Sequence, residues 1–477
     1  MKAQVSRTTH YVVLGIGLIL AAATLSIVPP SSGAPAAAFN VTTAASSTDW
    51  TTYLQGNDRS GFTSDSGFNP TSVKTLHLAW QASDTAPNHG VFSQPIVSNG
   101  LTYWGSFDGR ERATDSSGNL VWQTNLGTSS PPGCTDPSEA GIASTPTLTT
   151  DVPVDGATSV LYVGGGNSKF YALNAATGAV LWSYNVGGSP NTFIWSSPAV
   201  FGNSVYIGVA SFGTCPDVQG RLLQLNRVTG ALQHRFNVVP HGCIGAGVWS
   251  SPTIDAAAGT IYFTTGNQDD CTRKEKAPAI IEVRASDLSL VGSWTIPLAQ
   301  QTCCGDGDWA ATPTLFTGGQ SQAMVGSINK NGVFYAFKRD ALRSGPVWHK
   351  RIATGGENPT TGTGDIAPAA WDGTTLYVGG DMTSSCNGTV NALNPSTGAV
   401  IWHHCFSAGP VLGAVTATSG GVVAVGEGNK IAVLSAATGA SVFTFTGTGP
   451  FWGPPSIVGN NLYEGDMSGN LYALTTN

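Results

Sequence analysis

The sequence reads Ala172-Leu173-Asn174-Ala175-Ala176-Thr177-Gly178-Ala179-Val180-Leu181-Trp182 and, much later, Ala392-Leu393-Asn394-Pro395-Ser396-Thr397-Gly398-Ala399-Val400-Ile401-Trp402. Both stretches share one frame, in which an Ala-Leu-Asn triplet is followed by Thr-Gly and then by a tryptophan at a fixed offset. Weaker copies of the frame surround Ser117-Gly118, Thr229-Gly230 and Thr438-Gly439, and a looser copy runs from Ala336 to Trp348. The chain is therefore built from an internal repeat.

The repeated unit is predicted to be a β-hairpin. Asn and Gly at the centre of the frame permit the turn conformations that a tight strand reversal requires. A single hairpin cannot bury its apolar face, so a repeat of about 40–50 residues rich in short strands is typical of propeller blades stacked around an axis. The trailing tryptophan is expected to pack between neighbouring units.

Eight blades are predicted, because eight short segments resemble the first strand of a blade. The segments begin at Ser93, Ser144, Ser196, Ser250, Ala311, Ile366, Gly413 and Gly453. All of them contain proline except the segment from Gly413 to Thr416. The last blade ends at Leu474 without an outer strand. The segment Thr75 to Trp80 has the alternation and the trailing tryptophan of a missing fourth strand, and pairing it there would leave no sheet edge open.

The frame resembles the tryptophan-docking repeat of the pyrroloquinoline quinone (PQQ) family of β-propellers, which includes quinoprotein alcohol dehydrogenases and polyvinyl-alcohol dehydrogenases. The likeness covers nearly the whole chain after Asp49, and Asp49 to Tyr53 also resembles the start of such domains. The resemblance implies an all-β, eight-bladed propeller of four-stranded antiparallel blades, closed by an N-terminal strand. Some members of the family bind no cofactor.

The N-terminus has the features of an export signal. Lys2 and Arg7 precede an uncharged run from Tyr11 to Val28, and the small residues Ala36 to Ala38 offer a cleavage site. We expect a signal peptide over 1–38, a flexible linker over 39–48 and the propeller over 49–477, in a protein that is secreted, extracellular or periplasmic, with no membrane association after cleavage. An uncleaved membrane anchor is the alternative, because the run is about the minimum length for a transmembrane helix.

Composition and cysteine content narrow the function classes. Only 10% of the residues are charged, and 28 acidic residues exceed 21 Lys and Arg, which argues against a nucleic-acid partner.

Eight cysteines in an exported chain suggest disulfides. Cys386 with Cys405 and Cys215 with Cys243 are the pairs we expect. Cys303 and Cys304 either form a vicinal disulfide or pair separately with Cys271 and Cys134, and the second arrangement is favoured.

The resemblance places candidate site residues in the fourth and fifth blades. Trp249 precedes a strand, and Asn267 ends a Thr-Gly-Asn motif, which looks like the family's pair of a quinone-stacking tryptophan and a calcium-binding asparagine. An indole face can stack on a planar quinone, and an amide oxygen is a suitable ligand for calcium. The alternative is that Trp249 is another docking aromatic and Asn267 a turn residue.

Acidic and basic candidates follow downstream. Aligning on Pro313 and Leu315 puts Asp306 at the family's catalytic base and metal contact, with Asp308 two residues on; the alternative is that both lie in a solvated turn. The strand after Lys330-Asn331 resembles the one whose cationic residue bonds to the quinone oxygens, so Lys330 and Asn331 are assigned to the cofactor. The family's metal-binding glutamate is missing from the third blade, where Asp217 is the nearest substitute.

Two functions remain open at the level of the sequence. The first is a PQQ- and calcium-dependent dehydrogenase that oxidises a small-molecule or polymeric alcohol, with Asp306 and Lys330 as catalytic residues. No Cys-x-x-Cys-His haem attachment motif occurs in the sequence, so electrons would pass to a separate acceptor. The second is a non-catalytic propeller that presents a binding surface to a protein or a polysaccharide.

Overall fold

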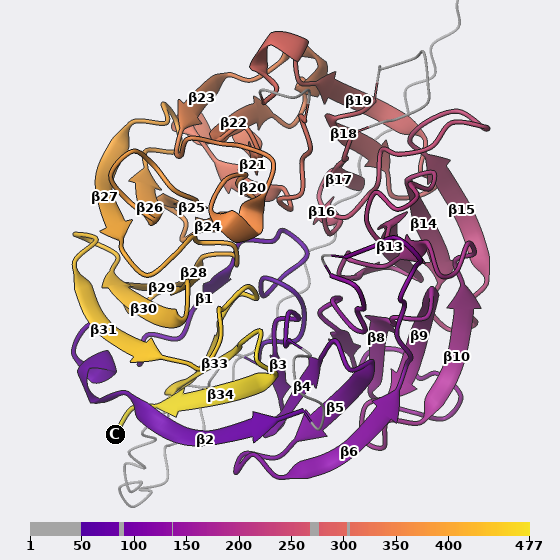
Figure 1. Cartoon of the computed structure of the whole chain (residues 1–477), viewed down its shortest axis with the longest axis horizontal. Helices are drawn as coiled ribbons and strands as arrows, with labels where there is room; N and C mark the ends of the chain where they lie inside the picture. The colour runs from indigo at the N-terminus through magenta and orange to yellow at the C-terminus, as the bar shows by residue number, and fades with distance from the viewer. Residues whose placement is uncertain (1–48, 85–89, 136, 268–275, 303–305) are drawn as a thin grey trace, which may run out of the picture. The chain divides into compact units, whose positions relative to one another are not determined.

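A computed structural model of the chain describes residues 49–84, 90–135, 137–267, 276–302 and 306–477. Their strands form eight sheets arranged as a ring around one axis (Figure 1). Each sheet is a four-stranded antiparallel blade, to which short extra strands are added in the third and seventh blades. The predicted eight-bladed propeller is confirmed, while the predicted signal peptide over 1–38 and linker over 39–48 lie outside the described residues.

The two inner strands of each blade are largely buried. The innermost strands are β3 (Ile96–Ser98), β7 (Thr147–Thr149), β12 (Ala199–Phe201), β16 (Thr253–Asp255), β20 (Thr314–Thr317), β24 (Ala370–Trp371), β28 (Thr416–Thr418) and β32 (Ser456–Val458). The second strands are β4 (Leu101–Gly105), β8 (Val160–Gly164), β13 (Ser204–Ser211), β17 (Thr260–Thr264), β21 (Ala323–Asn329), β25 (Leu376–Gly380), β29 (Val422–Glu427) and β33 (Asn461–Gly465).

The two outer strands complete each blade. The third strands are β5 (Arg110–Thr114), β9 (Lys169–Asn174), β14 (Arg221–Asn226), β18 (Ala279–Arg284), β22 (Val333–Lys338), β26 (Gly388–Leu393), β30 (Lys430–Ser435) and β34 (Asn470–Thr475). The outermost strands are β6 (Leu120–Asn125), β10 (Val180–Asn185), β15 (Leu232–Asn237), β19 (Leu290–Thr295), β23 (Trp348–Arg351), β27 (Val400–Phe406), β31 (Ser441–Thr446) and β2 (His77–Ser83).

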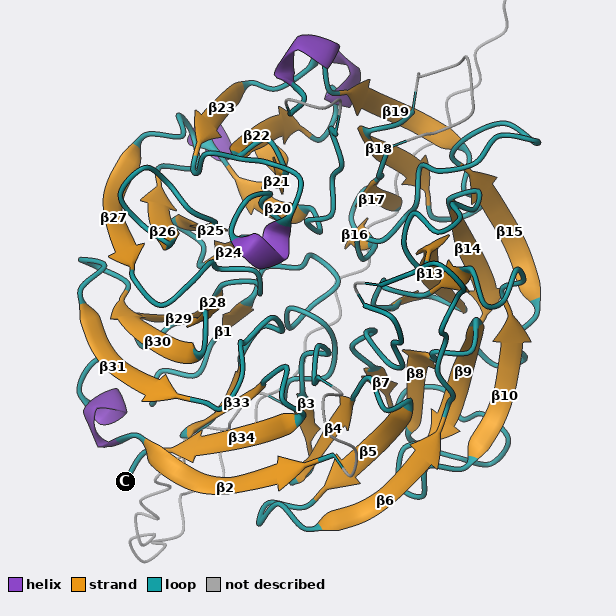
Figure 2. Cartoon of the chain, in the orientation of Figure 1, coloured by secondary structure: helices purple, strands orange, loops and turns teal. Residues whose placement is uncertain are grey.

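Few other elements occur in the described residues. The extra strands are β1 (Phe62–Thr63) and β11 (Thr192–Phe193), and the 3-10 helices are η1 (Ser72–Thr75), η2 (Leu298–Gln300), η3 (Gly319–Ser321), η4 (Leu342–Ser344) and η5 (Pro359–Thr361). Figure 2 shows that helices appear only as short turns between strands. Among the described residues, no helix has the length and apolar character needed to cross a bilayer.

The repeated glycine and tryptophan join neighbouring blades. The Trp122 indole N–H on β6 donates to the carbonyl of Ala175 in the next blade, at 2.9 Å. Gly178 lies under the same ring with φ +72°, and a Cβ there would come within 2.5 Å of a ring carbon. Only glycine tolerates both the backbone conformation and this approach. The same contact occurs between Trp80 and Gly118, Trp182 and Gly230, Trp348 and Gly398, and Trp402 and Gly439.

A ring of hydroxyl groups joins the inner ends of several blades. The Thr145 hydroxyl accepts the Gln94 N–H, and the Ser197 hydroxyl accepts the Thr145 N–H, at 2.8 and 2.9 Å. The hydroxyls of Ser251 and Thr312 continue the chain into the fourth and fifth blades, each at 2.9 Å. These residues directly precede the recurring prolines of the blades, so the Ser/Thr-Pro pattern indicates contacts between blades.

The predicted position of the prolines at the start of each blade is corrected by the structure. The prolines were expected inside the innermost strands, whereas Pro95, Pro146, Pro198, Pro252 and Pro313 each lie immediately before one. The reason is that proline has no N–H to donate to a sheet ladder, so it is accommodated at the entry to a strand.

The ring is closed by the predicted N-terminal strand. β2 pairs antiparallel with β34, from His77 opposite Thr475 to Ser83 opposite Asn470. In Figure 1 the indigo β2 runs beside the yellow β34. Trp80 then docks on the first blade, where its indole N–H donates to the Ser116 carbonyl at 3.0 Å. The closure predicted from Thr75 to Trp80 is confirmed.

The segment 50–63 follows the inside of the ring, which the sequence did not predict. Its backbone bonds to innermost strands of successive blades: Trp50 with Val97, Thr51 with Leu148, Asn57 with Ile254, Asp58 with Leu315, Ser60 with Trp371 and Gly61 with Ala417, at 2.7–3.0 Å. β1 then adds parallel to β28. The side chain of Arg59 is fully buried within this circuit. The segment therefore joins six blades to one another.

Candidate functional site

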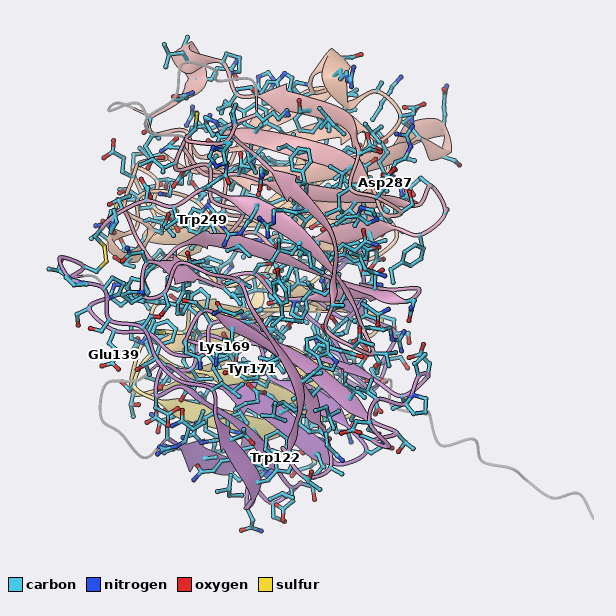
Figure 3. All side chains as sticks on the ribbon, turned by 90° about the vertical axis from the view of Figure 1, so that its right-hand side faces the viewer. Trp122, Glu139, Lys169, Tyr171, Trp249 and Asp287 are labelled. Atoms are coloured by element: carbon cyan, nitrogen blue, oxygen red, sulfur yellow. A yellow bond between two sulfur atoms is a disulfide. The ribbon has the colours of Figure 1, made fainter. Side chains whose placement is uncertain are left out.

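A cavity of about 760 Å³ lies on the propeller axis. Its lining includes Tyr53 from the N-terminal segment and the hydroxyl residues Thr145, Ser197, Ser251 and Thr312 of the inner ring. Figure 3 views the ring from the side and shows Glu139, a lining residue, at the face opposite Asp287, which lies in the turn between β18 and β19. Trp249 lies between these two faces in the same view.

An ionic cluster lies at the wall of this cavity in the fourth and fifth blades, and two of its three members line the cavity. Lys330 follows β21, and its Nζ lies 3.2 Å from a carboxylate oxygen of Asp306 and 3.2 Å from one of Asp308. The side chains of the three residues are between 10% and 20% exposed. Two carboxylates therefore share one buried ammonium group, and the cluster has a net charge of −1 when all three are ionised.

Asn267 joins the two aspartates. Its side-chain Nδ2 donates to Asp306 at 2.8 Å, and its side-chain Oδ1 accepts the Gly307 N–H at 3.0 Å. The backbone N–H of Asn267 donates to Asp308. Gly266 makes this approach possible, because a Cβ there would lie 2.9 Å from the Asp308 carboxylate. The Thr-Gly-Asn motif thus positions both aspartates.

Trp249 lies beside the cluster, before β16. The Nζ of Lys330 is 5.4 Å from the centre of the indole ring, which is within the range of a cation–π contact. Trp249 is partly exposed, and it lines the cavity together with Asn267, Asp308 and Lys330. Its position differs from that of the docking tryptophans, which lie on outer strands.

Burial shifts the protonation of the cluster. Burial raises the pKa of Asp308, and Asp306 raises it further, against the opposing effect of Lys330. Burial alone would lower the pKa of Lys330, but the two aspartates outweigh it and the net shift is upward. The Asp308 carboxylate is thus more basic than one in water, while Lys330 stays cationic.

The sequence-predicted residues fall into two groups. Trp249, Asn267, Lys330 and Asp217 line the axial cavity, and Asp308 joins them. Asp306 does not belong to this lining, although it bonds to Lys330 and Asn267 behind it.

Asn331 faces a different pocket from the one to which it was assigned. Its side-chain amide donates to the Gln300 carbonyl at 2.7 Å and to the Tyr335 hydroxyl at 2.8 Å. It lines a side pocket at the fifth blade instead of the axial cavity. The Lys330-Asn331 turn therefore separates two pockets, with one side chain directed to each.

An aromatic wall of the axial cavity was not predicted. Phe92, Phe107, Trp195 and Phe212 all line the cavity, and the ring centres of Phe92 and Phe107 are 6.1 Å apart. Trp195 lies 6.3 Å from Phe92 and 6.1 Å from Phe212. These residues fall outside the repeat frame, so no pattern in the sequence distinguishes them from other core aromatics.

One predicted disulfide is wrong. Cys215 bonds to Cys134 and not to Cys243, which is itself in a disulfide. The neighbours of Cys134 and Cys215, among them Thr135 and Thr214, line the same cavity, so the two loops meet at the axis although they come from different blades. Cys134 and Cys215 are 81 residues apart, so their positions in the sequence did not indicate that the two loops are in contact.

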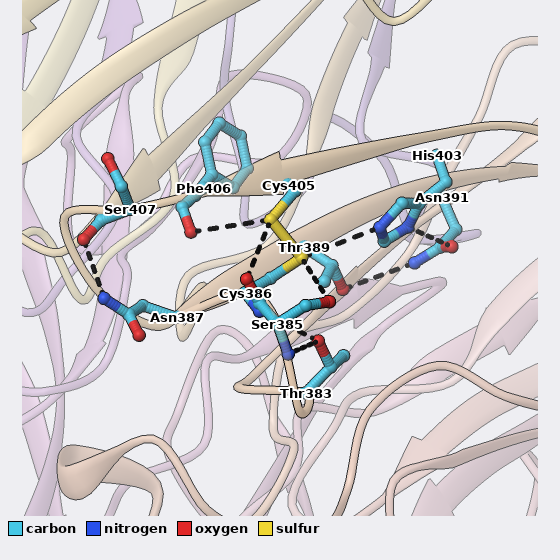
Figure 4. Close-up of a disulfide and its surroundings, with 10 residues drawn as sticks. All are labelled: Thr383, Ser385, Cys386, Asn387, Thr389, Asn391, His403, Cys405, Phe406 and Ser407. Atoms are coloured by element: carbon cyan, nitrogen blue, oxygen red, sulfur yellow. Dashed lines mark hydrogen bonds between the residues drawn. A yellow bond between two sulfur atoms is a disulfide. The ribbon is translucent and has the colours of Figure 1, made fainter.

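The other predicted disulfide is confirmed. Cys386 bonds to Cys405 on β27 (Figure 4). His403 lies beside the bond, with its Nε2 3.8 Å from the Cys386 sulfur. The favoured pairing of Cys303 and Cys304 with Cys271 and Cys134 is wrong for Cys134, because that residue bonds to Cys215. Cys271, Cys303 and Cys304 lie outside the described residues, so the other predicted pairings stay untested.

The fold and its docking contacts define a β-propeller of the PQQ-repeat type. The chain belongs to the family described as "Outer membrane protein assembly factor BamB", which matches residues 108–360 and 386–477. This family accounts for the repeated frame from which the blades were predicted.

Curated relatives are dehydrogenases of greater length. A quinohemoprotein alcohol dehydrogenase of Comamonas testosteroni is 26% identical over 270 residues, which cover 49% of this chain and 36% of that protein. A polyvinylalcohol dehydrogenase of a Pseudomonas species is 25% identical over 353 residues, which cover 62% of this chain and 54% of that protein. The chain thus spans about half or less of the length of these relatives.

Solved structures share the fold. The Comamonas testosteroni quinohemoprotein alcohol dehydrogenase superposes with a TM-score of 0.68 at 19% identity, covering 90% of this chain and 80% of that one. A europium-containing methanol dehydrogenase gives 0.70 at 15% identity, with 90% and 98% covered. BamB from Moraxella catarrhalis gives 0.56 at 17% identity, with 84% and 99% covered. At these identities the likeness shows the architecture alone.

Proposed function

We propose that the chain is a quinoprotein dehydrogenase that oxidises an alcohol with PQQ and calcium. The observation that carries the proposal is the convergence of Trp249, Asn267, Asp308 and Lys330 on one axial cavity. These residues come from separate parts of the fourth and fifth blades, and packing of the blades does not require an ionic cluster there. Buried charges that perturb one another in a cavity are typical of a functional site.

The cavity has the features that a planar, anionic quinone requires. Its volume of about 760 Å³ lies within the range of small-molecule and cofactor sites. Trp249 offers a ring face, and Lys330 offers a cation next to that face. A site with these two groups can hold an aromatic ring system by stacking and its oxygen atoms by charge.

The donor set also fits a calcium ion. Asp306 and Asp308 exceed the single charge of Lys330, so a further cation would balance the cluster before an anion enters. Asp308 and Asp217 supply carboxylate oxygens to the cavity, and Asn267 supplies an amide oxygen. Calcium takes six to eight oxygen ligands, so the quinone and water would complete a coordination shell that the protein fills only in part.

Asp308 is the better candidate for the general base. It lines the axial cavity, whereas Asp306 does not. When bound, the quinone supplies the acceptor for the hydride that leaves the substrate carbon. Asp308 accepts the hydroxyl proton, and burial, by raising its pKa, favours that transfer. Lys330 remains protonated beside it and stabilises negative charge in the cavity.

The substrate and the electron acceptor are proposed at the level of chemical class. The dehydrogenase relatives have alcohols in their names, and one of them acts on a polymeric alcohol, so we assign this chain a small-molecule or polymeric alcohol. Electrons would leave through a separate acceptor. We further propose export through residues 1–38, in keeping with the disulfides of the propeller.

Calorimetry of the protein with PQQ tests the proposal directly. Heat of binding is expected in the presence of calcium and not in its absence, and Trp249→Ala should abolish it through lost stacking. Absence of heat with both ligands at micromolar protein would instead favour a non-catalytic propeller that binds a protein or a polysaccharide.

A matched pair of variants then tests the base. Asp308→Asn should retain PQQ binding and lose dye-linked alcohol oxidation by about 100-fold or more. Asp306→Asn should lose less, because its carboxylate acts through Asn267 and Lys330. If Asp306→Asn loses more activity than Asp308→Asn, Asp306 is the base and the assignment of Asp308 is refuted.

A further inference from the structure

The side pocket at the fifth blade is a second cavity, of about 710 Å³. Its walls are formed by η2 and the residues after it, by β22 and β23, and by the loop at 354–356. It has no lining residue in common with the axial cavity. The Lys330-Asn331 turn lies between the two.

The lining of the side pocket is cationic. His349, Lys350 and Arg351 are consecutive on β23 and all three line it, whereas no Asp or Glu occurs among its described lining residues. In the described parts of the chain none of the three forms an ion pair. The chain as a whole is acidic, with a formal net charge of −7, so the pocket departs from the general charge balance.

Arg351 is held in place by the backbone. Its Nη1 donates to the carbonyl oxygens of Asn331, Ala353 and Thr354, at 2.9, 3.2 and 3.1 Å. These contacts use one nitrogen of a guanidinium group that has three. The carboxyl that Arg351 influences, Asp365, is buried, and burial raises its pKa to about 7, so it compensates the arginine only in part at neutral pH. The guanidinium is thus fixed at the pocket wall with part of its charge available to a ligand.

Neutral amides accompany the cations. Gln300 and Gln301 line the same pocket. Thr302 and Asn331 line it too, but the Thr302 hydroxyl donates to the Asp306 carbonyl and the Asn331 amide donates to Gln300 and Tyr335. Amide, ammonium and guanidinium groups together match the acceptor oxygens of a carboxylate or a phosphate, and charge-assisted hydrogen bonds of this kind are the strong ones.

We propose that this side pocket binds a small oxyanion, a carboxylate or phosphate group, between Lys350, Arg351 and the amides of the η2 loop. The site is independent of the dehydrogenase proposal, because none of its residues lines the axial cavity. Its ligand would contact the wall that also holds the Lys330 backbone, whose carbonyl accepts the Gly356 N–H at 2.9 Å.

Calorimetric titration of the full chain with citrate and, separately, with inorganic phosphate tests the site. At low ionic strength we expect saturable binding of at least one of the two, weakened by added sodium chloride because screening reduces the attraction. Heat with citrate alone would assign a carboxylate ligand, and heat with phosphate alone would assign a phosphate ligand. Absence of saturable heat from both anions at millimolar concentrations would overturn the proposal.

Two charge reversals locate the binding. Lys350→Glu should weaken it at least about tenfold, the size expected when a charged hydrogen-bond donor is lost. Lys338→Glu changes the net charge equally, on an exposed residue of β22 outside the pocket lining, and should leave the affinity unchanged. Equal weakening by both variants would mean that the anion responds to overall charge and not to this pocket. Thermal melting of each variant checks that the fold is retained.

Discussion

Replacing Arg59 by alanine should destabilise the whole ring, because this side chain links the N-terminal circuit to two blades. Its guanidinium is fully buried and donates to the carbonyls of Pro198 at 2.9 Å, Pro252 at 3.0 Å and Tyr53 at 2.6 Å. Burial lowers its pKa to about 10, with Tyr53 and Asp58 opposing the shift, so the group is still protonated at neutral pH.

The expected loss follows from these contacts. A hydrogen bond to a charged group contributes about 1.5–3 kcal/mol, so three give an upper sum of about 4.5–9 kcal/mol. The cost of burying the guanidinium offsets part of this sum. We expect the free energy of unfolding to fall by about 4 kcal/mol. With roughly 430 folded residues and about 2.1 cal/mol/K per residue, the unfolding entropy is about 0.9 kcal/mol/K, which predicts a fall in Tm of about 4–5 °C.

Differential scanning calorimetry compares this variant with Arg343→Ala. Arg343 is exposed and also donates to a backbone carbonyl, that of Val291 at 2.6 Å, so it is a control for loss of one arginine and one hydrogen bond. Its removal should change stability by less than about 0.5 kcal/mol. Equal Tm values for wild type and Arg59→Ala, or an equal fall for the two variants, would refute a role for the circuit in joining the blades.

Three further expectations concern the termini and buried acids. Removing residues 1–47 should leave Tm and solubility unchanged, whereas removing 1–81 deletes the circuit and most of β2 and should give aggregates by size exclusion; similar melting of both truncations would contradict this. The intact mass of exported protein should correspond to a start near Phe39, and a product retaining residues 1–30 would contradict it. Burial raises the pKa values of Asp365 and Asp381, so the folded state binds their protons more tightly than the unfolded chain and stability should fall as pH rises above about 4. Asp381→Asn should flatten that fall in melts between pH 5 and 8, and an unchanged slope would exclude the pair as its source.

The blades and their closure were predictable because their determinants are local. Four of the six copies of the frame end in a tryptophan that docks on the glycine of the next copy, so a local pattern indicates a contact between blades. The N-terminal circuit carries no such pattern. Its contacts with the blades are largely backbone–backbone hydrogen bonds, which any sequence can make, and only Arg59, buried within it, marks it.

The choice between Asp306 and Asp308 shows where sequence reasoning stops. The two residues flank one glycine, and alignment on the following proline favoured Asp306. The structure separates them through residues distant in the chain: Asn267 directs its side-chain amide to Asp306 and its backbone N–H to Asp308. Only Asp308 reaches the cavity wall. Because the packing of blades four and five brings these groups together, the proposed base could be chosen only from the structure, and the paired asparagine variants test that choice.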